Sequence, residues 1–215
     1  MGLQSHIQDA SSLLVSKLTS PGPQNIYRGF RSLGSDIITE FSFGKSYKSL
    51  EVPGFAHSII LSVDRIAEWQ FWTMYFAPIA WLMHDVGPVI VKVLGAGFVG
   101  GMSKMLQDAE DAVDECLRGE ELHKASIVPM MKEMGVDRLN LIGEATNLVI
   151  AGGHTVSNTL TIGMVRMVQT KGVQDRVYEE LCGIWPDIDE ECPDWQELEE
   201  LPYLVVLLLG SRINC

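Results

Sequence analysis

The chain has 215 residues, and 47% of them are hydrophobic, which is enough for one large domain or two small ones with a sizeable core. Asp and Glu number 28 against 16 Lys and Arg, a net charge of −12, and so acidic a chain repels phosphate backbones, which argues against nucleic acid as a partner. Four cysteines without C-x-x-C spacing favour neither a zinc knuckle nor a disulfide scaffold. We expect no metal-ligand set and no signal peptide, and no transmembrane span because no long apolar window lacks a charge.

Helical spacing of apolar residues dominates the chain and strand signals are nearly absent, so the sequence predicts a mainly α protein. Ser35 is placed to cap a helix over Asp36–Phe43, which Gly44 would terminate. Asp137 is placed to cap a helix that continues to about Thr170, roughly 50 Å at 1.5 Å per residue. The other predicted helices cover Gln4–Leu18, Ser58–Phe76, Ser103–Arg118, Val173–Leu181, Trp195–Leu201 and Tyr203–Leu209.

The centre of the long helix, LVIAGGHTVSNTL at 148–160, carries unusually poor helix formers. Gly152 and Gly153 each cost about 1 kcal/mol in a helix relative to Ala. One interpretation is a helix crossing, in which small residues let two backbones approach, with His154 hydrogen-bonded nearby. The other is a local widening or kink that exposes a hydroxyl to a ligand lying against the helix. The position of the glycines does not choose between them.

A second glycine pattern, GAGFVG at 95–100, satisfies G-x-G-x-x-G after a β-branched run. A dinucleotide-binding fold also needs a second parallel strand ending in an acidic residue about 20 positions on. That position is Glu115, in the middle of an amphipathic helical pattern, so we favour a glycine-rich connection between helices, one that touches a membrane surface.

Three segments decide between the interpretations of the long helix. Ala151-Gly152-Gly153-His154-Thr155 resembles the A-G-x-[acid]-T segment of the long distal helix of cytochrome P450 enzymes. The stretch SDIITEFSFGKSY at 35–47 resembles the D-x-I-T-E-x-x-F-G-x-S segment of fungal P450s of secondary metabolism. Residues 173–204, ending in ELEELPYL, are similar to the segment that follows the distal helix in fungal members. The three segments occur in the family's order, and the resemblance covers 26–204, with 205–215 a divergent tail.

The resemblance implies a partial P450 fold, with haem as cofactor and the long helix crossing the distal face of the haem. It implies that Thr155 hydrogen-bonds bound oxygen and helps deliver protons, and that Ala151 and Gly152 lie against haem and substrate. The family usually has an acid where this chain has His154. Because the unperturbed pKa of a histidine is near 6.5, His154 is either a second catalytic residue that relays protons or a spacer with a different hydrogen bond.

The resemblance further implies hydroxylation or epoxidation of a hydrophobic small molecule, with electrons from NADPH through NADPH-cytochrome P450 reductase. Full-length members reside at the endoplasmic reticulum membrane. Residues 71–101 would form the roof of the access channel and make peripheral membrane contact. This chain, without a signal or clear transmembrane helix, would be cytoplasmic or membrane-peripheral.

The family's axial cysteine loop, F-x-x-G-x-R-x-C, and its E-x-x-R element have no match in this chain. A thiolate axial ligand is what favours O–O cleavage in these enzymes. We therefore expect residues 1–215 to form a single incomplete P450-like domain that is inactive alone, with Leu148, Val149 and Ile150 exposed where the haem and the missing half would pack. The alternative is a non-catalytic helical protein that binds a lipid or a protein partner.

Overall fold

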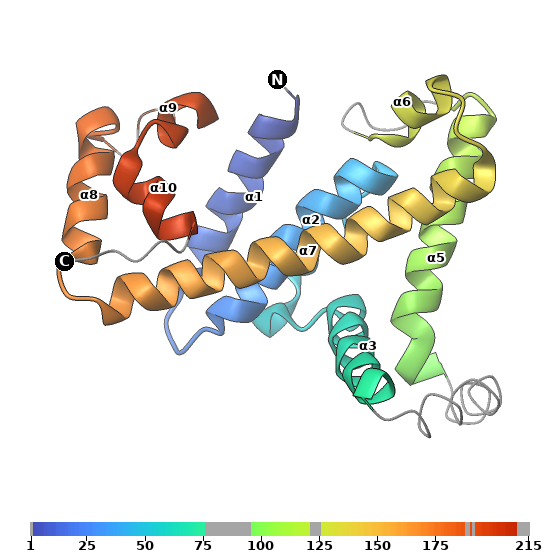
Figure 1. Ribbon diagram of the computed structural model, residues 1–215, viewed down its shortest axis with the longest axis horizontal. Coiled ribbons are helices and arrows are strands. Elements are labelled where there is room, and N and C mark those ends of the chain that lie inside the picture. Colours follow the sequence, from blue (N-terminus) through green and yellow to red (C-terminus); the bar gives the residue numbers. More distant parts are fainter. Residues whose placement is uncertain (1, 76–95, 121–125, 188–189, 191, 210–215) are drawn as a thin grey trace.

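The computed structural model describes residues 2–75, 96–120, 126–187, 190 and 192–209, and all regular structure in these ranges is helical (Figure 1). This confirms the mainly α class. The helices are α1 (Gly2–Leu18), α2 (Ile26–Phe43), α3 (Ser58–Tyr75), α5 (Ala96–Leu117), α6 (Val128–Glu133), α7 (Arg138–Gln169), α8 (Val173–Ile184), α9 (Trp195–Glu199) and α10 (Pro202–Leu209), with the short 3-10 turns η1 (Ser49–Glu51) and η2 (Pro53–Phe55).

Helix α7 spans the molecule and separates two groups of helices. In Figure 1 it runs from α5 and α6 at one end to α8, α9 and α10 at the other, with α2 crossing it near the middle. The Asp137 carboxylate accepts hydrogen bonds from the backbone N–H groups of Leu139 and Asn140, so the predicted N-cap is confirmed. The 32 residues of α7 also confirm the predicted long helix.

Helix α2 is longer than the sequence predicts. It begins at Ile26, where Asn25 accepts a hydrogen bond from the N–H of Arg28, and Ser35 lies buried in its interior, so the prediction of a cap at Ser35 is wrong. Gly29 and Gly34 lie inside the helix and resemble breakers in the sequence, but buried packing on α1 and α7 outweighs their propensity. The predicted end is confirmed, because Gly44 adopts the left-handed conformation with φ 73°.

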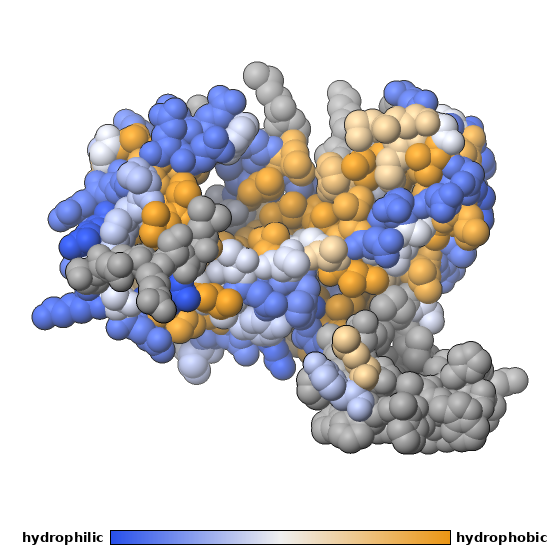
Figure 2. Space-filling view, viewed as in Figure 1, coloured by the Kyte–Doolittle hydropathy of each residue, from blue (hydrophilic) through white to orange (hydrophobic). Residues whose placement is uncertain are grey.

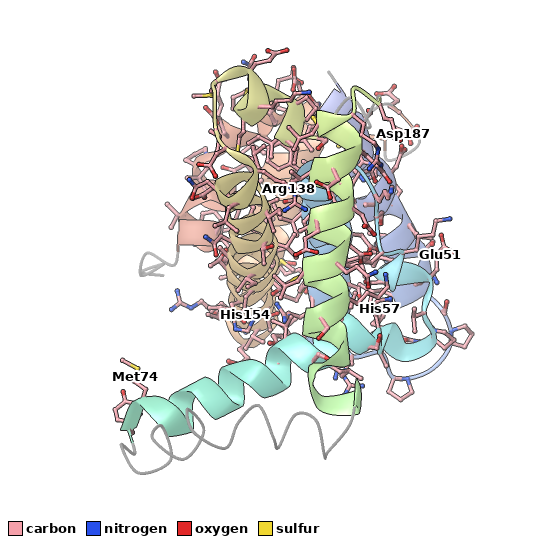
Figure 3. All side chains as sticks on the ribbon, turned by 90° about the vertical axis from the view of Figure 1, so that its right-hand side faces the viewer. Glu51, His57, Met74, Arg138, His154 and Asp187 are labelled. Carbon is pink, nitrogen blue, oxygen red and sulfur yellow. The ribbon has the colours of Figure 1, made fainter. Side chains whose placement is uncertain are left out.

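The main core lies between α2, α5 and α7. The predicted amphipathic helix over Ser103–Arg118 is confirmed, although α5 begins earlier, at Ala96, so Gly97 and Gly100 of the G-x-G-x-x-G pattern lie within a helix rather than in a phosphate-binding turn. At the first residue of α7, Arg138 donates two hydrogen bonds to Asp114 of α5, at 2.7 and 2.9 Å (Figure 3). The buried side chains of this core are Phe43, Met105, Ala109, Ala112, Val113, Cys116, Val128, Leu141, Ile142, Ala145 and Val149.

A buried carboxylate joins α2 to the loop that leads to α3. Asp36 is 5% exposed and accepts hydrogen bonds from the backbone N–H groups of Ser49 (2.7 Å) and Leu50 (2.9 Å) at the start of η1. Burial raises the pKa of Asp36, and the two backbone hydrogen bonds oppose that shift. This long-range cap determines where the chain turns from α2 toward α3.

Helix α3 begins at a histidine cap that responds to pH. His57 Nδ1 accepts a hydrogen bond from the N–H of Ile59 (3.3 Å), and the ring stacks on Tyr47 at 5.9 Å between centroids. Figure 3 shows His57 at the start of α3. Burial lowers the pKa of His57, the nearby Asp36 carboxylate opposes this shift, and Lys104 of α5 adds to it. A protonated ring would lose the Nδ1 acceptor.

We expect acidification to weaken the fold through His57. Because the pKa of His57 is lower in the folded state, its contribution to stability is fully present above about pH 6.5 and is lost as the pH falls through the folded value. Asp36 works in the opposite direction, because its raised pKa favours protonation of the folded state, so the contribution of His57 is measured against His57→Asn, which keeps a capping acceptor. Urea unfolding between pH 7.5 and 5 should show a steeper loss of stability in the wild type. Parallel pH profiles would contradict this role for His57.

By length and composition, α7 is the one helix in the described ranges that could cross a membrane. Its most apolar stretch of 18 residues has a mean hydropathy of 1.2. Only 22% of that stretch is buried within the protein, although α7 contacts α2, α5, α8 and α10.

Candidate active site

The predicted site residues lie halfway along α7, which is α-helical at every position from Arg138 to Gln169. The predicted local widening at Gly152 and Gly153 is therefore not seen. Thr155 Oγ1 donates a hydrogen bond to the backbone carbonyl of Ala151, at 2.9 Å, within the same helix. This bond leaves the lone pairs of the hydroxyl oxygen free to accept.

Ala151 and Thr155 lie on an open strip of the helix. Both are exposed, as is Thr159, whose Oγ1 donates to the Thr155 carbonyl at 3.0 Å. Residues four apart share one face of an α-helix, so these side chains form a continuous line, which we call the hydroxyl strip. A flat ligand can approach this strip closely because its side chains are small, and two hydroxyl groups are available to it.

The neighbouring face of the same segment carries the helix crossing. A methyl group on Gly34 of α2 would lie 3.2 Å from the backbone oxygen of Gly153, and one on Gly152 would lie 2.8 Å from Ile38 Cδ1. The two backbones thus approach as closely as glycine allows. For Gly152 and Gly153 the structure supports the helix-crossing interpretation, and the exposed hydroxyl strip needs no kink.

His154 and the apolar residues before the strip differ in their surroundings. His154 is half-buried, and in the described part of the chain its imidazole makes no hydrogen bond or ion pair (Figure 3). Val149 is only 7% exposed because it packs into the core with Ile142 and Ala145, so the expectation that it is exposed is wrong. Ile150 is exposed, as expected, and Leu148 is half-buried.

Further along α7, large apolar side chains face solvent. They are Val156, Ile162, Val165 and Val168. In Figure 2, orange apolar residues gather along the middle of the molecule, where α7 crosses α2. Exposed apolar side chains of this kind are where another surface or a ligand can pack, although these four do not share one face of α7.

The small side chains of the hydroxyl strip leave room for a flat ligand such as the haem that the resemblance implies. The described residues do not complete a haem centre. Cys116 is enclosed in the core between α5 and α7, and Cys182 lies on α8. Within the described ranges no group of three His, Cys, Asp or Glu side chains is arranged to hold a metal ion.

The fold and the site define a class of mainly helical proteins. These are built around a long helix that has a strip of small residues at its centre. The cytochrome P450 family model matches residues 2–208, and the chain belongs to this family. The match extends beyond the 26–204 that the resemblance covers.

The curated relatives are fungal monooxygenases. The chain is 22% identical over 221 residues to the cytochrome P450 monooxygenase flvC of Aspergillus flavus, with 96% of this chain and 40% of that protein covered. It is 26% identical to the grayanic acid biosynthesis cluster cytochrome P450 monooxygenase of Cladonia grayi, with 97% and 42% covered. Identity to the cytochrome P450 monooxygenase sol6 of Alternaria solani is 23%, with 85% and 42% covered. The chain thus spans about two fifths of the length of these relatives.

Sequence reasoning missed the residues that hold α2 and α3 around the site. Arg31, which is 3% exposed, pairs with Asp64 of α3, Nη2 to Oδ1, at 2.7 Å. The sequence signal for this pair is a charged residue between Phe30 and Leu33 on the apolar face of α2. It indicates a buried charge but does not identify the partner, which lies 33 positions away.

We expect Thr155→Val to change the stability of the chain by less than about 0.5 kcal/mol. The hydroxyl is exposed and bonds only within its own helix, so its net contribution is small. The matched control is Ser157→Ala, which removes a buried hydroxyl bonded to the Gly153 carbonyl at 2.7 Å and should cost about 1 kcal/mol. Urea unfolding compares the two. A large loss for Thr155→Val alone would give the residue a structural role.

Proposed function

We propose that this chain forms the distal part of a haem-thiolate monooxygenase that hydroxylates or epoxidises a hydrophobic small molecule. The observation that carries the proposal is the exposed hydroxyl strip at the centre of α7 in a chain that matches the P450 family. Bound haem, held by a thiolate, supplies the oxygen-activating chemistry, with electrons from NADPH through a reductase. The strip supplies the surface that orients the reacting partners.

The residues that the family resemblance singles out contribute differently to this site. Ala151 keeps the helix surface low enough for a macrocycle and substrate to lie against it, whereas Gly152, which the resemblance also places there, packs against Ile38 of α2. The Thr155 hydroxyl accepts a hydrogen bond through its free lone pairs, or rotates away from the Ala151 carbonyl and donates a hydrogen bond to the ligand. His154, one position earlier, either passes protons toward Thr155 or acts as a spacer.

We propose that the 215 residues are inactive by themselves, because the family's axial cysteine loop and E-x-x-R element have no match among them. After reconstitution with haemin and reduction with dithionite, the chain should show no P450-type carbon monoxide difference spectrum. A complete family member treated in parallel is the positive control. A P450-type Soret band from the chain alone would refute this part of the proposal.

The role of Thr155 is tested in the longer protein. Sequencing the transcript past the codon for Leu204 shows whether the reading frame continues into E-x-x-R and a cysteine loop. In a protein so extended, Thr155→Ala should lower product formation by about 10²-fold, because a positioned proton donor contributes that much. Thr159→Ala, one turn further along the strip, is the matched control and should retain most activity. Equal activity in all three proteins would remove Thr155 from catalysis.

A second candidate, a non-catalytic protein that binds a lipid or a protein partner, draws on the exposed apolar side chains of α7. Localisation at the endoplasmic reticulum membrane would suit either function. The proposed membrane contact through 71–101 falls largely on residues outside those described. Co-sedimentation of the chain with phospholipid vesicles, compared with Val165→Asp and Val168→Asp variants, tests this candidate directly. Equal sedimentation of all variants would remove α7 as the binding face.

A further inference from the structure

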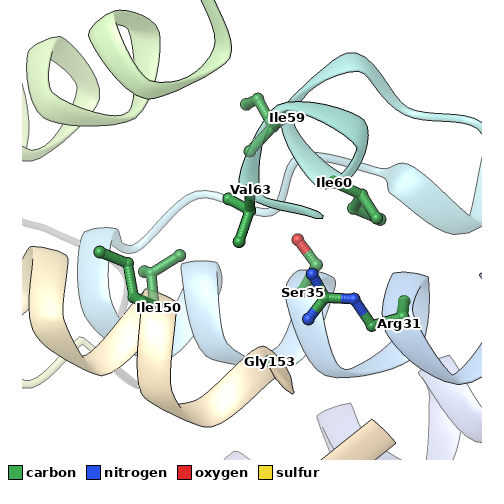
Figure 4. Close-up of a pocket in the computed structure, with 8 residues that line it drawn as sticks. Arg31, Ser35, Ile59, Ile60, Val63, Ile150 and Gly153 are labelled. Carbon is green, nitrogen blue, oxygen red and sulfur yellow. The ribbon is translucent and has the colours of Figure 1, made fainter. Parts of the chain in front are cut away.

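A small pocket opens between α2, α3 and α7, beside Val149 at the edge of the main core (Figure 4). Its floor is polar, made by Arg31 and Ser35 of α2, and Gly153 of α7 lies beside them. Its other walls are the apolar side chains of Ile59, Ile60, Val63, Val149 and Ile150. The free volume is about 20 Å³, which exceeds the 10–15 Å³ that one water molecule needs, so the floor has room for a single oxygen-sized group.

The polar floor carries an unused hydrogen-bond donor. Arg31 is 3% exposed, and its Nε is buried with no hydrogen-bond partner among the described residues. Ser35 is 8% exposed, and its hydroxyl also makes no hydrogen bond within the described ranges. A buried N–H is rarely left without an acceptor, so the pocket lacks a group that accepts from Arg31 Nε.

The charge of the pocket limits what that acceptor is. Asp64 Oδ1 lies 2.7 Å from Arg31 Nη2, so the guanidinium charge is already balanced by a carboxylate. An added anion would face Asp64 as well as Arg31, and a cation would face a donor. A neutral acceptor avoids both the repulsion between an anion and Asp64 and the repulsion between a cation and Arg31.

The rim of the pocket is apolar and partly open. Ile150 is 38% exposed, while Ile59 and Ile60 are buried, which places the opening on the α7 side. An apolar body can therefore rest on the rim while its oxygen enters the floor. Gly153 in this pocket is two residues before Thr155, so the pocket and the hydroxyl strip lie on opposite faces of the same helix.

We propose that this pocket binds the hydroxyl or carbonyl oxygen of a neutral, otherwise apolar small molecule, with Arg31 Nε and Ser35 as donors. This is a binding site separate from the proposed one, because the pocket lies on the face of α7 opposite the hydroxyl strip. Arg31 is then a ligand-binding residue, because its Nε donates to the oxygen of the molecule held between α3 and α7.

The test uses the whole 215-residue chain labelled with ¹⁵N, in which the Arg31 Nε–Hε resonance reports directly on the donor. Arg31→Lys identifies this resonance by removing it. Titration with cyclohexanol should shift the resonance saturably. Cyclohexanecarboxylate and cyclohexylammonium should bind about tenfold more weakly or not at all.

Variants separate this site from nonspecific binding. Ser35→Ala should weaken cyclohexanol binding about three- to tenfold, because one hydrogen bond is lost. Arg28→Lys, at an exposed position of the same helix, is the matched control and should leave the titration unchanged. If Arg31→Lys fails to fold, the Arg31 resonance is instead assigned by triple-resonance spectra of the wild type, and Ser35→Ala decides.

Two results would overturn the proposal. If cyclohexanol leaves the Nε–Hε resonance in place while that proton shows a cross-peak to water, the pocket holds only an internal water. If the carboxylate binds more tightly than the alcohol, the pocket is an anion site. Neither measurement needs haem or turnover, so failure here is distinguishable from failure of the proposed monooxygenase function, which the carbon monoxide spectrum and Thr155→Ala examine.

Discussion

Gly34→Val is expected to lower the free energy of unfolding of this chain by about 3 kcal/mol, at the upper end of what overpacking costs. Even a single methyl group at Gly34 would lie 3.2 Å from the Gly153 oxygen and 3.4 Å from the Gly153 Cα, and both are backbone atoms. They cannot rotate away as a side chain can, so α2 and α7 must separate. Urea unfolding followed by far-UV circular dichroism measures the loss.

Two other glycine substitutions are matched controls for the crossing. A methyl group on Gly143 of α7 would meet nothing within 4 Å, and one on Gly153 would meet its nearest atom at 3.8 Å, an ordinary contact. Both alanine variants should therefore gain up to about 1 kcal/mol from helix propensity. The contrast between Gly34→Val and Gly153→Ala tests whether it is the Gly34 side of the crossing that has no room for a side chain. Similar losses for both, or a stable Gly34→Val protein, would show that α2 and α7 cross differently.

Asp64→Ala is expected to destabilise the chain by about 2 to 3 kcal/mol, because it leaves the Arg31 guanidinium buried without its carboxylate. The estimate lies below that for a fully buried pair because the Asp64 side chain is 32% exposed and partly screened by water. The loss should appear in chemical denaturation, and α3 should lose amide protection before α7 does.

The double variant Arg31→Met/Asp64→Ala is the control for this ion pair. A methionine replaces the stem of the arginine without a charge, so the double variant should recover most of the stability that Asp64→Ala loses. Asp114→Ala provides a comparison at the surface, where the partner Arg138 is half exposed and the expected loss is much smaller than that of Asp64→Ala. If Asp64→Ala costs no more than Asp114→Ala, Arg31 does not depend on its partner.

Local signals were sufficient for several helices. The Asp137 cap, the glycine after α2 and the glycine after α7 are short-range features, and each marks the predicted boundary correctly. The hydroxyl strip was also accessible from sequence, because Ala151 and Thr155 are four apart on one helix and match a family segment. That their side chains share one face follows from helical periodicity alone, and the packing of α7 decides that this face is exposed.

Features that join distant segments could not be predicted. Ser35 is as good a cap as Asn25 by residue type, and only the burial of Phe30 and Leu33 shows that the helix continues through Gly29 and Gly34. Val149 and Ile150 are adjacent apolar residues, and the side on which α5 packs decides which one is buried.

The amino-acid sequence by itself determined the helical class, the bounds of the central helix and the identity of the strip that Thr155 occupies, because each depends on interactions within a few residues. The tertiary structure alone decided that the glycine pair serves a helix crossing, that Arg31 meets Asp64, and that a polar floor with an unused donor lies beside Gly153. These depend on backbones and charges brought together from positions far apart in the chain, where no local pattern specifies the partner.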